Sequence, residues 1–178
     1  MLDDLDALRE FLPRTPFFGG LTAAQLERIL ARLKRRDFAR GAPIFSEGQT
    51  GRSMYIVQSG ILMLSKGCGQ GHEVKLVRLG AGDFFGENTL IEMQPRPNTV
   101  TVVKDAVLYE LTNMDLYALY REDVEGYVMV LQNINRELCR RLRMSDARLT
   151  EIAGDLDEEV TQIRTEHDPI VMQAAKAK

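Results

Sequence analysis

Short apolar runs separated by glycine, serine, asparagine or aspartate fill the sequence between Phe38 and Leu111. The runs are PIF, MYIV, ILMLS, VKLVRL, TVTVV and AVLYEL. Short strands at close spacing with glycine between them are typical of an antiparallel sandwich or barrel. We therefore expect an antiparallel β-domain in the middle of the chain, with a tight hairpin turn at Ser59-Gly60, between two of the runs.

A glycine-rich segment, KGCGQGH, occupies residues 66–72 within this domain. Glycine-rich loops that bind phosphate run from a strand into the N-terminus of a helix, where free backbone amides gather. This segment leads instead into VKLVRL, which has the pattern of a strand. We predict a flexible hairpin loop here rather than a phosphate-binding loop.

Two helices are predicted before the β-domain. The first lies within residues 1–14 and has leucines at helical spacing, namely Leu2, Leu5, Leu8 and Leu12. Thr22 is the expected N-cap of the second, whose apolar face comprises Leu26, Ile29, Leu30 and Leu33. Basic residues 34–36 follow, and we interpret them as the solvated end of this helix in preference to a phosphate-binding patch.

Helical patterns return after the β-domain. Asn113 is expected to cap a short helix through Tyr120, and a long helix is predicted over residues 123–165. Its apolar stripe is close to a heptad repeat and comprises Leu131, Ile134, Leu138, Leu142, Leu149, Ile152, Leu156, Val160 and Ile163. A helix of roughly 40 residues is about 60 Å long, so its distal half needs a partner helix. We therefore expect a homodimer through this helix and a flexible tail at 166–178.

Composition excludes several classes of protein. The 178 residues suffice for one well-buried core but hardly for two full domains. The net charge of −3 gives no global electrostatic reason to bind nucleic acid. No run approaches the roughly 18 apolar residues of a membrane span, and the start, MLDDLDALRE, is acidic, so we expect a cytoplasmic protein without membrane association.

The sequence also offers little for metal binding or catalysis. Cys68 and Cys139 show no CxxC or neighbouring histidine pattern, and the two histidines, His72 and His167, lie far apart, which argues against a metal site. No nucleophile–base pair or carboxylate pair occurs at a recognisable spacing. We therefore expect neither a metal cofactor nor enzymatic activity.

The segment FFGENTLIEMQPRPNTVTV, residues 84–102, places a fixed cation near a carboxylate. Arg96 lies between two prolines, whose rings fix φ near about −65° and restrict the residue before each. Glu87 precedes it by nine positions, and FGENTL could begin a short helix with free amides. A guanidinium suits phosphate oxygens, and a carboxylate suits a sugar hydroxyl. A single phosphate beside a ribose hydroxyl describes a cyclic mononucleotide, although this chemistry alone leaves other small anions open.

The run FGENTLIEMQPRPNTV resembles the phosphate-binding cassette of cyclic nucleotide-binding domains, whose usual form is roughly FGE-L-A-L, four residues, then PRAATV. Before the cassette the resemblance includes Phe38, Gly41, Ile44, Glu47-Gly48, residues 54–56, Gly60 and residues 79–87. After it, CRRLRMSD (139–146) resembles the dimer helix of the bacterial catabolite activator family. About residues 15–150 are covered.

The resemblance implies an α+β fold. Residues 15–122 would form an antiparallel β-roll or jelly roll (a double-stranded β-helix), with N-terminal helices before it and a long C-terminal dimerisation helix after it. The ligand would be cAMP or cGMP, bound without a metal.

The resemblance also implies roles for individual residues. Arg96 would bind the cyclic phosphate, and Glu87 would bind the ribose 2′-hydroxyl. Three neighbours would offer backbone groups: Gly86, Asn88 and Thr89. In the activator family two adjacent residues of the dimer helix contact the base, one from each subunit, and Ser145 and Asp146 occupy these positions. Ser145 also interrupts the apolar stripe, where a polar residue could instead set the register of a dimer.

Four positions depart from the usual cassette. Pro97 replaces a small residue whose backbone N–H reaches the phosphate, and losing such a bond costs about 1.5–3 kcal/mol, or about ten- to a hundredfold in affinity. Asn88-Thr89 replaces Leu-Ala, and Asn98 replaces the second Ala. Many cGMP-selective domains have threonine directly after the arginine, so Pro97 favours cAMP, whereas Asp146 could accept a hydrogen bond from guanine.

Two functional hypotheses follow. The first is a cytoplasmic cyclic nucleotide receptor, for cAMP rather than cGMP, that signals to a partner protein through its C-terminal helix. Relatives that regulate transcription carry a helix-turn-helix domain after this helix, and too few residues follow Thr165 to form one, so no DNA binding is expected. The alternative is a structural dimerisation module with a vestigial pocket, a hypothesis motivated by Pro97 and the Asn88-Thr89 pair.

Overall fold

The structure is a computed structural model of the chain and describes residues 8–9, 11–69, 71–92 and 94–155. The chain divides into two compact units, Met1–Asn135 and Arg136–Lys178. The first unit holds the whole sheet and the shorter helices. The second unit holds the distal part of the long C-terminal helix.

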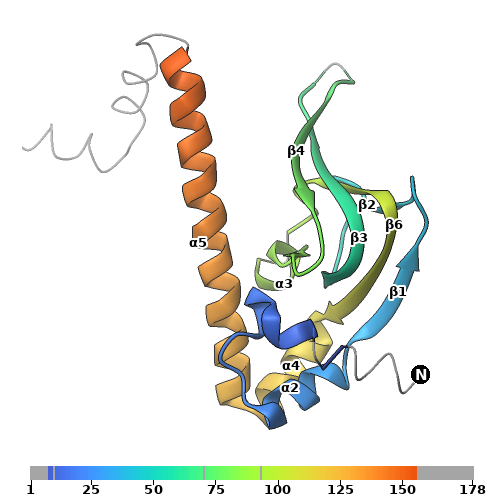
Figure 1. Ribbon diagram of the computed structural model, residues 1–178, viewed down its shortest axis with the longest axis vertical. Coiled ribbons are helices and arrows are strands. Elements are labelled where there is room, and N and C mark those ends of the chain that lie inside the picture. The colour runs from blue at the N-terminus through green and yellow to red at the C-terminus, as the bar shows by residue number, and fades with distance from the viewer. Residues whose placement is uncertain (1–7, 10, 70, 93, 156–178) are drawn as a thin grey trace, which may run out of the picture. The chain divides into compact units, whose positions relative to one another are not determined.

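One antiparallel sheet forms the body of the first unit, which confirms the predicted α+β class (Figure 1). Its strands are β1 (Lys34–Phe38), β2 (Pro43–Phe45), β3 (Ser53–Gly67), β4 (Glu73–Leu79), β5 (Phe84–Phe85) and β6 (Thr99–Thr112). β6 pairs with β1, β2 and β3, and β3 also pairs with β4 and β5. The two longest strands, β3 and β6, therefore carry the others.

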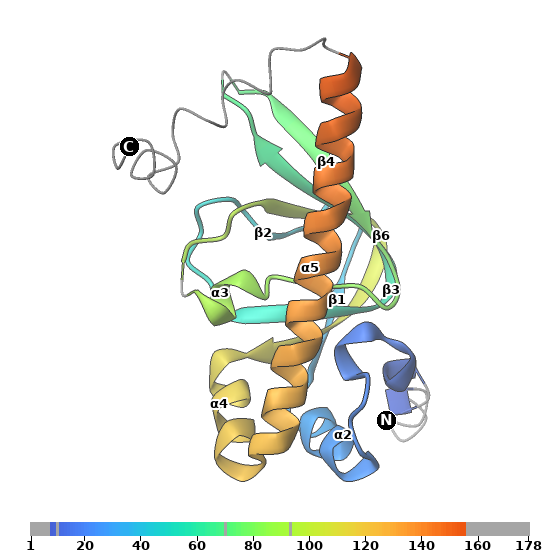
Figure 2. The same ribbon diagram turned by 90° about the vertical axis from the view of Figure 1, so that its left-hand side faces the viewer.

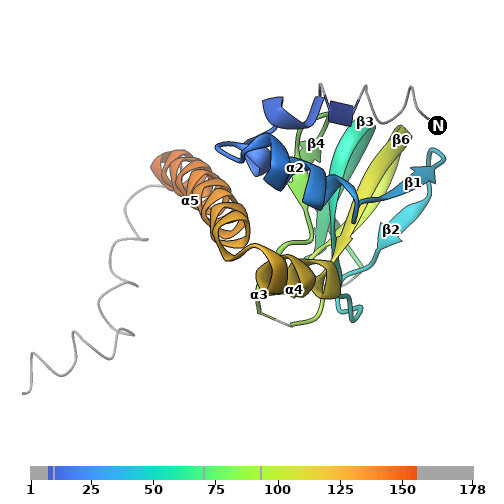
Figure 3. The same ribbon diagram turned by 90° about the horizontal axis from the view of Figure 1, so that it is seen from below.

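β3 and β6 run side by side along most of their lengths, from the pair Ser53–Thr112 to the pair Ser65–Thr99 (Figure 3). The predicted hairpin turn at Ser59-Gly60 is wrong, because both residues lie inside β3. Gly60 has a φ of +102°, and a Cβ there would come within 2.5 Å of the Cα of Ala106. Glycine thus allows β6 to approach closely where the register of the two strands shifts.

The glycine-rich segment after β3 is a hairpin loop, as predicted. β3 and β4 pair antiparallel on either side of it, beginning with the pair Gly67–Glu73. The loop leads directly into β4 and not into a helix, whereas a phosphate-binding loop of this kind requires a helix N-terminus.

The core of the β-domain consists of apolar side chains from five strands. The buried members are Phe45, Val57, Leu62, Leu79, Phe85, Val100, Val102, Ala106 and Leu108. Tyr55 packs on this cluster with its ring stacked 5.4 Å from that of Phe85, which in turn lies 5.8 Å from the ring of Phe45. These aromatic rings come from β2, β3 and β5 and hold the three strands together.

Helix α2 (Ala23–Leu30) begins where the sequence predicted. The hydroxyl of Thr22 accepts from the amide of Gln25, and the Gln25 side chain accepts from the amide of Thr22. The interpretation of residues 34–36 as the end of this helix is wrong, because they belong to β1. Pairing with β6 overrides the local helical pattern, and Arg36 forms an ion pair with Glu110 across the two strands at 2.8 Å.

Two 3-10 helices, η1 (Leu12–Arg14) and η2 (Pro16–Phe18), precede α2. The predicted first helix at 1–14 falls mostly outside the described residues. Asn133 anchors this segment, since its side-chain amide donates to the carbonyls of Phe17 and Gly19 at 2.9 and 2.8 Å.

Three helices follow β5 along the chain: α3 (Asn88–Ile91), α4 (Asn113–Glu122) and α5 (Val124–Asp155). The N-cap of α4 is Thr112 and not Asn113, because the Thr112 hydroxyl accepts from the amide of Asp115 and the Asp115 carboxylate accepts from the amide of Thr112. α5 begins beside Asp123, as predicted. Residues 156–165 of the predicted helix and the predicted tail at 166–178 lie outside the described residues. Within the described part of the chain, no helix combines the length and apolar character of a membrane span.

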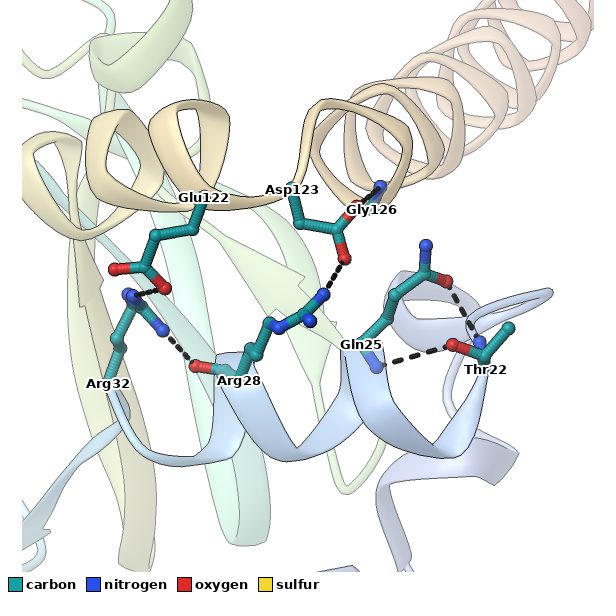
Figure 4. Close-up of polar contacts among 7 residues, drawn as sticks. All are labelled: Thr22, Gln25, Arg28, Arg32, Glu122, Asp123 and Gly126. Carbon is teal, nitrogen blue, oxygen red and sulfur yellow. Dashed lines mark hydrogen bonds and ion pairs between the residues drawn. The ribbon is translucent and has the colours of Figure 1, made fainter.

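The junction between α4 and α5 is tied to α2 (Figures 2 and 4). Asp123 is the N-cap of α5, since its carboxylate accepts from the amide of Gly126 at 2.9 Å. Arg28 of α2 forms an ion pair with Asp123, and Arg32, which follows the end of α2, forms another with Glu122 at 2.6 Å. α2 and the turn that follows it thus hold the beginning of α5.

Candidate functional site

The cassette predicted from the sequence leaves β5 at Gly86, forms α3 and returns through Arg96 to β6. Gly86 has a φ of +81°, and a Cβ there would lie 2.6 Å from Nη1 of Arg96. A Cβ at Gly51 would lie 2.4 Å from Nε of the same side chain. Two glycines, one in the β2–β3 loop and one after β5, therefore leave the space that the guanidinium occupies.

The guanidinium of Arg96 is buried, with 3% of the residue exposed. Its Nη1 donates to the carbonyl of Gly86 at 3.1 Å and to the hydroxyl of Thr89 at 2.9 Å. Its Nη2 donates to the carbonyl of Ser53 at 2.7 Å. The guanidinium carbon lies 4.0 Å from the centre of the Phe45 ring, in a cation–π contact. The arginine is held on several sides.

The backbone of Arg96 is held as firmly as its side chain. Its amide donates to the carbonyl of Gln49 at 2.9 Å, and its carbonyl accepts from the amide of Gly48 at 2.8 Å. Both partners belong to the loop between β2 and β3. The position of the arginine thus depends on this loop as well as on the cassette.

Burial lowers the pKa of Arg96, while the charges of Tyr55, Glu87 and Glu110 raise it. An arginine starts so far above neutrality that the guanidinium stays charged. Burying that charge is costly unless its donors find acceptors. A buried and permanently charged fork is therefore suited to an anion that reaches it.

Two buried side-chain atoms of the described residues lack a hydrogen-bond partner, namely Nε of Arg96 and Oε2 of Glu87. Glu87 is only 4% exposed and lies at the beginning of α3. Leaving a buried donor of a charged group unsatisfied carries a penalty of about 1–3 kcal/mol or more. The Nε–H of Arg96 is therefore an unused donor inside the cassette that the sequence predicts to bind a phosphate.

Thr89 contributes more than the predicted backbone group. Its hydroxyl donates to the carbonyl of Gly86 at 2.9 Å and accepts from Nη1 of Arg96. The alanine usual at this position has no hydroxyl and could make neither bond. Asn88 begins α3 and is half-buried.

Pro97 and Asn98, where the cassette ends, are half-buried. The carbonyl of Pro97 accepts from Nζ of Lys66 at 2.8 Å. Nζ of Lys66 also donates to Oε1 of Glu47 at 3.0 Å, and the amide of Glu47 donates to the hydroxyl of Thr99 at 3.0 Å. The end of the cassette is thereby joined to β3 and to the β2–β3 loop.

Sequence reasoning missed several residues of this site, among them Gln49 and Gly51 of the β2–β3 loop and three residues on strands. Phe45, Ser53 and Lys66 lie on β2 and β3 and reach the cassette only because these strands pair with β6 and β5. Lys66 opens the KGCGQGH segment, but a local pattern cannot show that this lysine faces a proline 31 residues later.

Ser145 and Asp146 lie on α5 within the second unit, and both are exposed. Their predicted contact with a nucleotide base stays a prediction. Among the described residues, no group of three or more His, Cys, Asp or Glu side chains could hold a metal ion.

Known proteins with similar sequences place this site in a family. Residues 35–123 match the family described as cyclic nucleotide-binding domain. The chain is 34% identical over 135 residues to the cyclic AMP receptor protein of Thermus thermophilus, an alignment that covers 76% of this chain and 61% of that protein. It is 40% identical over 93 residues to a cGMP-dependent protein kinase of Toxoplasma gondii, covering 52% of this chain and 9% of the kinase.

A solved structure supports the same relationship. The crystal structure of the Thermus thermophilus catabolite activator protein superimposes with a TM-score of 0.69 at 33% identity, covering 78% of this chain and 63% of that one. The chain thus spans about six tenths of the length of these Thermus proteins.

Proposed function

Because the chain belongs to the cyclic nucleotide-binding domain family, we propose that its cassette binds a cyclic mononucleotide, with cAMP preferred over cGMP. Arg96 would bind the cyclic phosphate, and Glu87 would bind the ribose 2′-hydroxyl. The single observation that carries this proposal is the buried guanidinium of Arg96, which is held by protein acceptors and keeps its Nε–H unused.

The preference for cAMP has support from Pro97. Many cGMP-selective domains of this family have threonine directly after the arginine. In this chain the position is Pro97, which has no hydroxyl. The similar proteins include a cyclic AMP receptor protein and a cGMP-dependent protein kinase, so similarity alone does not select the nucleotide. Ser145 and Asp146 are the proposed base contacts.

We further propose that the protein is a homodimer through α5 and acts as a regulator of a partner protein, in the cytoplasm, rather than as an enzyme. Support comes from the apolar stripe in the second unit, where Leu142, Leu149 and Ile152 are 62%, 63% and 56% exposed. These positions continue a heptad pattern, and burial of such a stripe against a second helix is a strong driving force for association. A ligand can change the position of this helix only if it binds more tightly to one position of the helix than to another.

Pro97 favours one alternative, a dimerisation module whose pocket no longer binds nucleotide. A proline removes the amide that the usual cassette directs to the phosphate. The two functions differ in one observable: only the receptor gains stability from a cyclic nucleotide.

Thermal unfolding of the purified protein with cAMP, cGMP or AMP tests the proposal. A ligand at about 100 times its Kd adds about 2.7 kcal/mol, which is a shift of several degrees for a chain of this size. We expect a shift with cAMP, a smaller one with cGMP and none with AMP. Arg96→Ala should abolish the shift, whereas Arg78→Ala, which removes an exposed arginine from β4, should keep it. No shift with either cyclic nucleotide would favour the dimerisation module.

A further inference from the structure

We propose that Lys66 is the second cation of the phosphate site and supplies the donor that Pro97 lacks. This proposal rests on the proposed function and adds to it a ligand-binding residue outside the cassette. It concerns a phosphate diester with a single negative charge, the anionic group of a cyclic nucleotide.

The first support is the donor capacity of the ammonium group. An ammonium carries three N–H donors. Among the described residues, Nζ of Lys66 donates to Oε1 of Glu47 at 3.0 Å and to the carbonyl of Pro97 at 2.8 Å. These bonds leave one donor on a side chain that is 50% exposed and therefore reachable from solvent.

The second support is the place of the ammonium. Pro97 directly follows Arg96, and its nitrogen is the atom that would carry the missing N–H. The nitrogen and carbonyl oxygen of one residue lie about 2.7 to 3.6 Å apart by covalent geometry. Nζ of Lys66 is therefore within roughly 6.5 Å of the Pro97 nitrogen, which places an ammonium beside the position of the missing N–H.

The third support is that Lys66 is held in this place. The Glu47 carboxylate that binds its ammonium also accepts from the amide of Gly67 at 2.9 Å. The Gly67 amide and then the Lys66 ammonium lower the pKa of Glu47, so this carboxylate is charged at neutral pH. The next residue, Gly48, binds the carbonyl of Arg96. The same loop thus positions both cations.

A structural role for Lys66, as one half of a surface ion pair, accounts for fewer of its contacts than a role in phosphate binding. Exposed pairs of lysine and glutamate contribute little to stability and need no further partner. Here the ammonium of Lys66 also donates to the carbonyl of Pro97. Pro97 is the cassette residue that has no backbone N–H to donate to a ligand. An ammonium can replace an amide donor toward a phosphate oxygen, because both donate an N–H and the ammonium adds a charge.

Titration of cAMP into four proteins tests the proposal: the wild type, Lys66→Gln, Lys66→Arg and Lys104→Gln. Lys104 is an exposed lysine of β6, so its replacement removes the same charge away from the site. We expect Lys66→Gln to weaken cAMP about tenfold or more, as the loss of a charge-assisted bond implies. Lys66→Arg should recover most of the affinity, and Lys104→Gln should stay within about twofold of the wild type.

The two phosphorothioate diastereomers of cAMP separate direct contact from an indirect effect. Each carries sulfur in place of a different exocyclic oxygen, so a residue that contacts one oxygen affects the two analogues unequally. We expect Lys66→Gln to change the ratio of their affinities. An equal loss for cAMP and both analogues would overturn the proposal in favour of a structural role.

The remaining outcomes distinguish this proposal from the function on which it rests. Wild-type affinity in Lys66→Gln, together with loss of binding in Arg96→Ala, would overturn the role of Lys66 alone. Failure of the wild-type protein to bind any cyclic nucleotide would overturn both.

Discussion

The hydroxyl of Thr89 accepts a hydrogen bond from Nη1 of Arg96 at 2.9 Å, and both residues are at least 97% buried. The same hydroxyl donates to the carbonyl of Gly86, to which Nη1 of Arg96 also donates. A closed set of three hydrogen bonds thus joins the first turn of α3 to the guanidinium. The arginine is pre-positioned before any ligand arrives, which reduces the ordering that binding must accomplish.

Replacing Thr89 tests this pre-positioning. Thr89→Val keeps the shape of the side chain but leaves one donor of a buried guanidinium without an acceptor. We expect it to lower the free energy of unfolding by about 1–3 kcal/mol. Thr89→Ser keeps the hydroxyl and should lose less. Thermal unfolding without ligand measures both, and equal melting temperatures for Thr89→Val and the wild type would show that this hydrogen bond does not matter.

Gly51 offers a purely steric test of the arginine's position. A Cβ there would lie 2.4 Å from Nε of Arg96, so Gly51→Ala must displace the guanidinium from its place over Phe45. We expect at least a tenfold loss of affinity for cAMP, equivalent to about 1.4 kcal/mol. Gly80→Ala is the matched control, since a Cβ there meets nothing within 4 Å. Similar affinities for the two variants, measured by calorimetric titration, would contradict the assigned position.

Asp123 predicts a dependence of stability on pH. The Gly126 amide and, less strongly, the Arg28 guanidinium lower its pKa below 3.8, although burial opposes them. A carboxylate with a depressed pKa in the folded state stabilises above its unfolded pKa and loses this contribution as pH falls through the folded value. We expect Asp123→Ala to be less stable than the wild type near neutral pH and the difference to shrink below pH 3.8.

Melting temperatures from about pH 7 to about pH 3 measure this difference. Asp123→Asn retains an oxygen that can accept from the Gly126 amide but has no charge for Arg28, so its stability should lie between the other two. A constant difference between Asp123→Ala and the wild type across this range would exclude the titration of Asp123 as its source.

The exposed stripe of α5 predicts the oligomeric state. Leu149→Glu places a charge at a position of the heptad pattern and should convert a dimer to a monomer, because a buried unpaired charge is expensive. Thr150→Glu introduces the same charge one residue further along the helix, outside the stripe, and should leave the dimer intact. Sedimentation velocity distinguishes the two. A monomeric wild-type protein would refute dimerisation through this helix.

The fold class and most of the cassette could be predicted from the sequence, for local reasons. Apolar runs with glycine between them identify antiparallel strands, and Thr22, as an N-cap residue before an apolar face, identifies the start of α2. The two prolines that flank Arg96 restrict its backbone, so the sequence predicts a cation in a fixed position. Each of these signals lies within a few residues of the feature that it predicts.

Contacts between distant segments decided the rest. Residues 34–36 carry a pattern that continues a helix, yet they form β1 because β6 offers a paired edge and an opposite charge at Glu110. Gly60 looks like a turn residue, yet it lies inside β3 because β6 passes too close for a side chain there. Phe45 and Ser53 reach Arg96, and Lys66 reaches Pro97, only after their strands have paired. Periodicity reports the neighbours of a residue along the chain, whereas the acceptors around the guanidinium come from segments that only the folded sheet brings together.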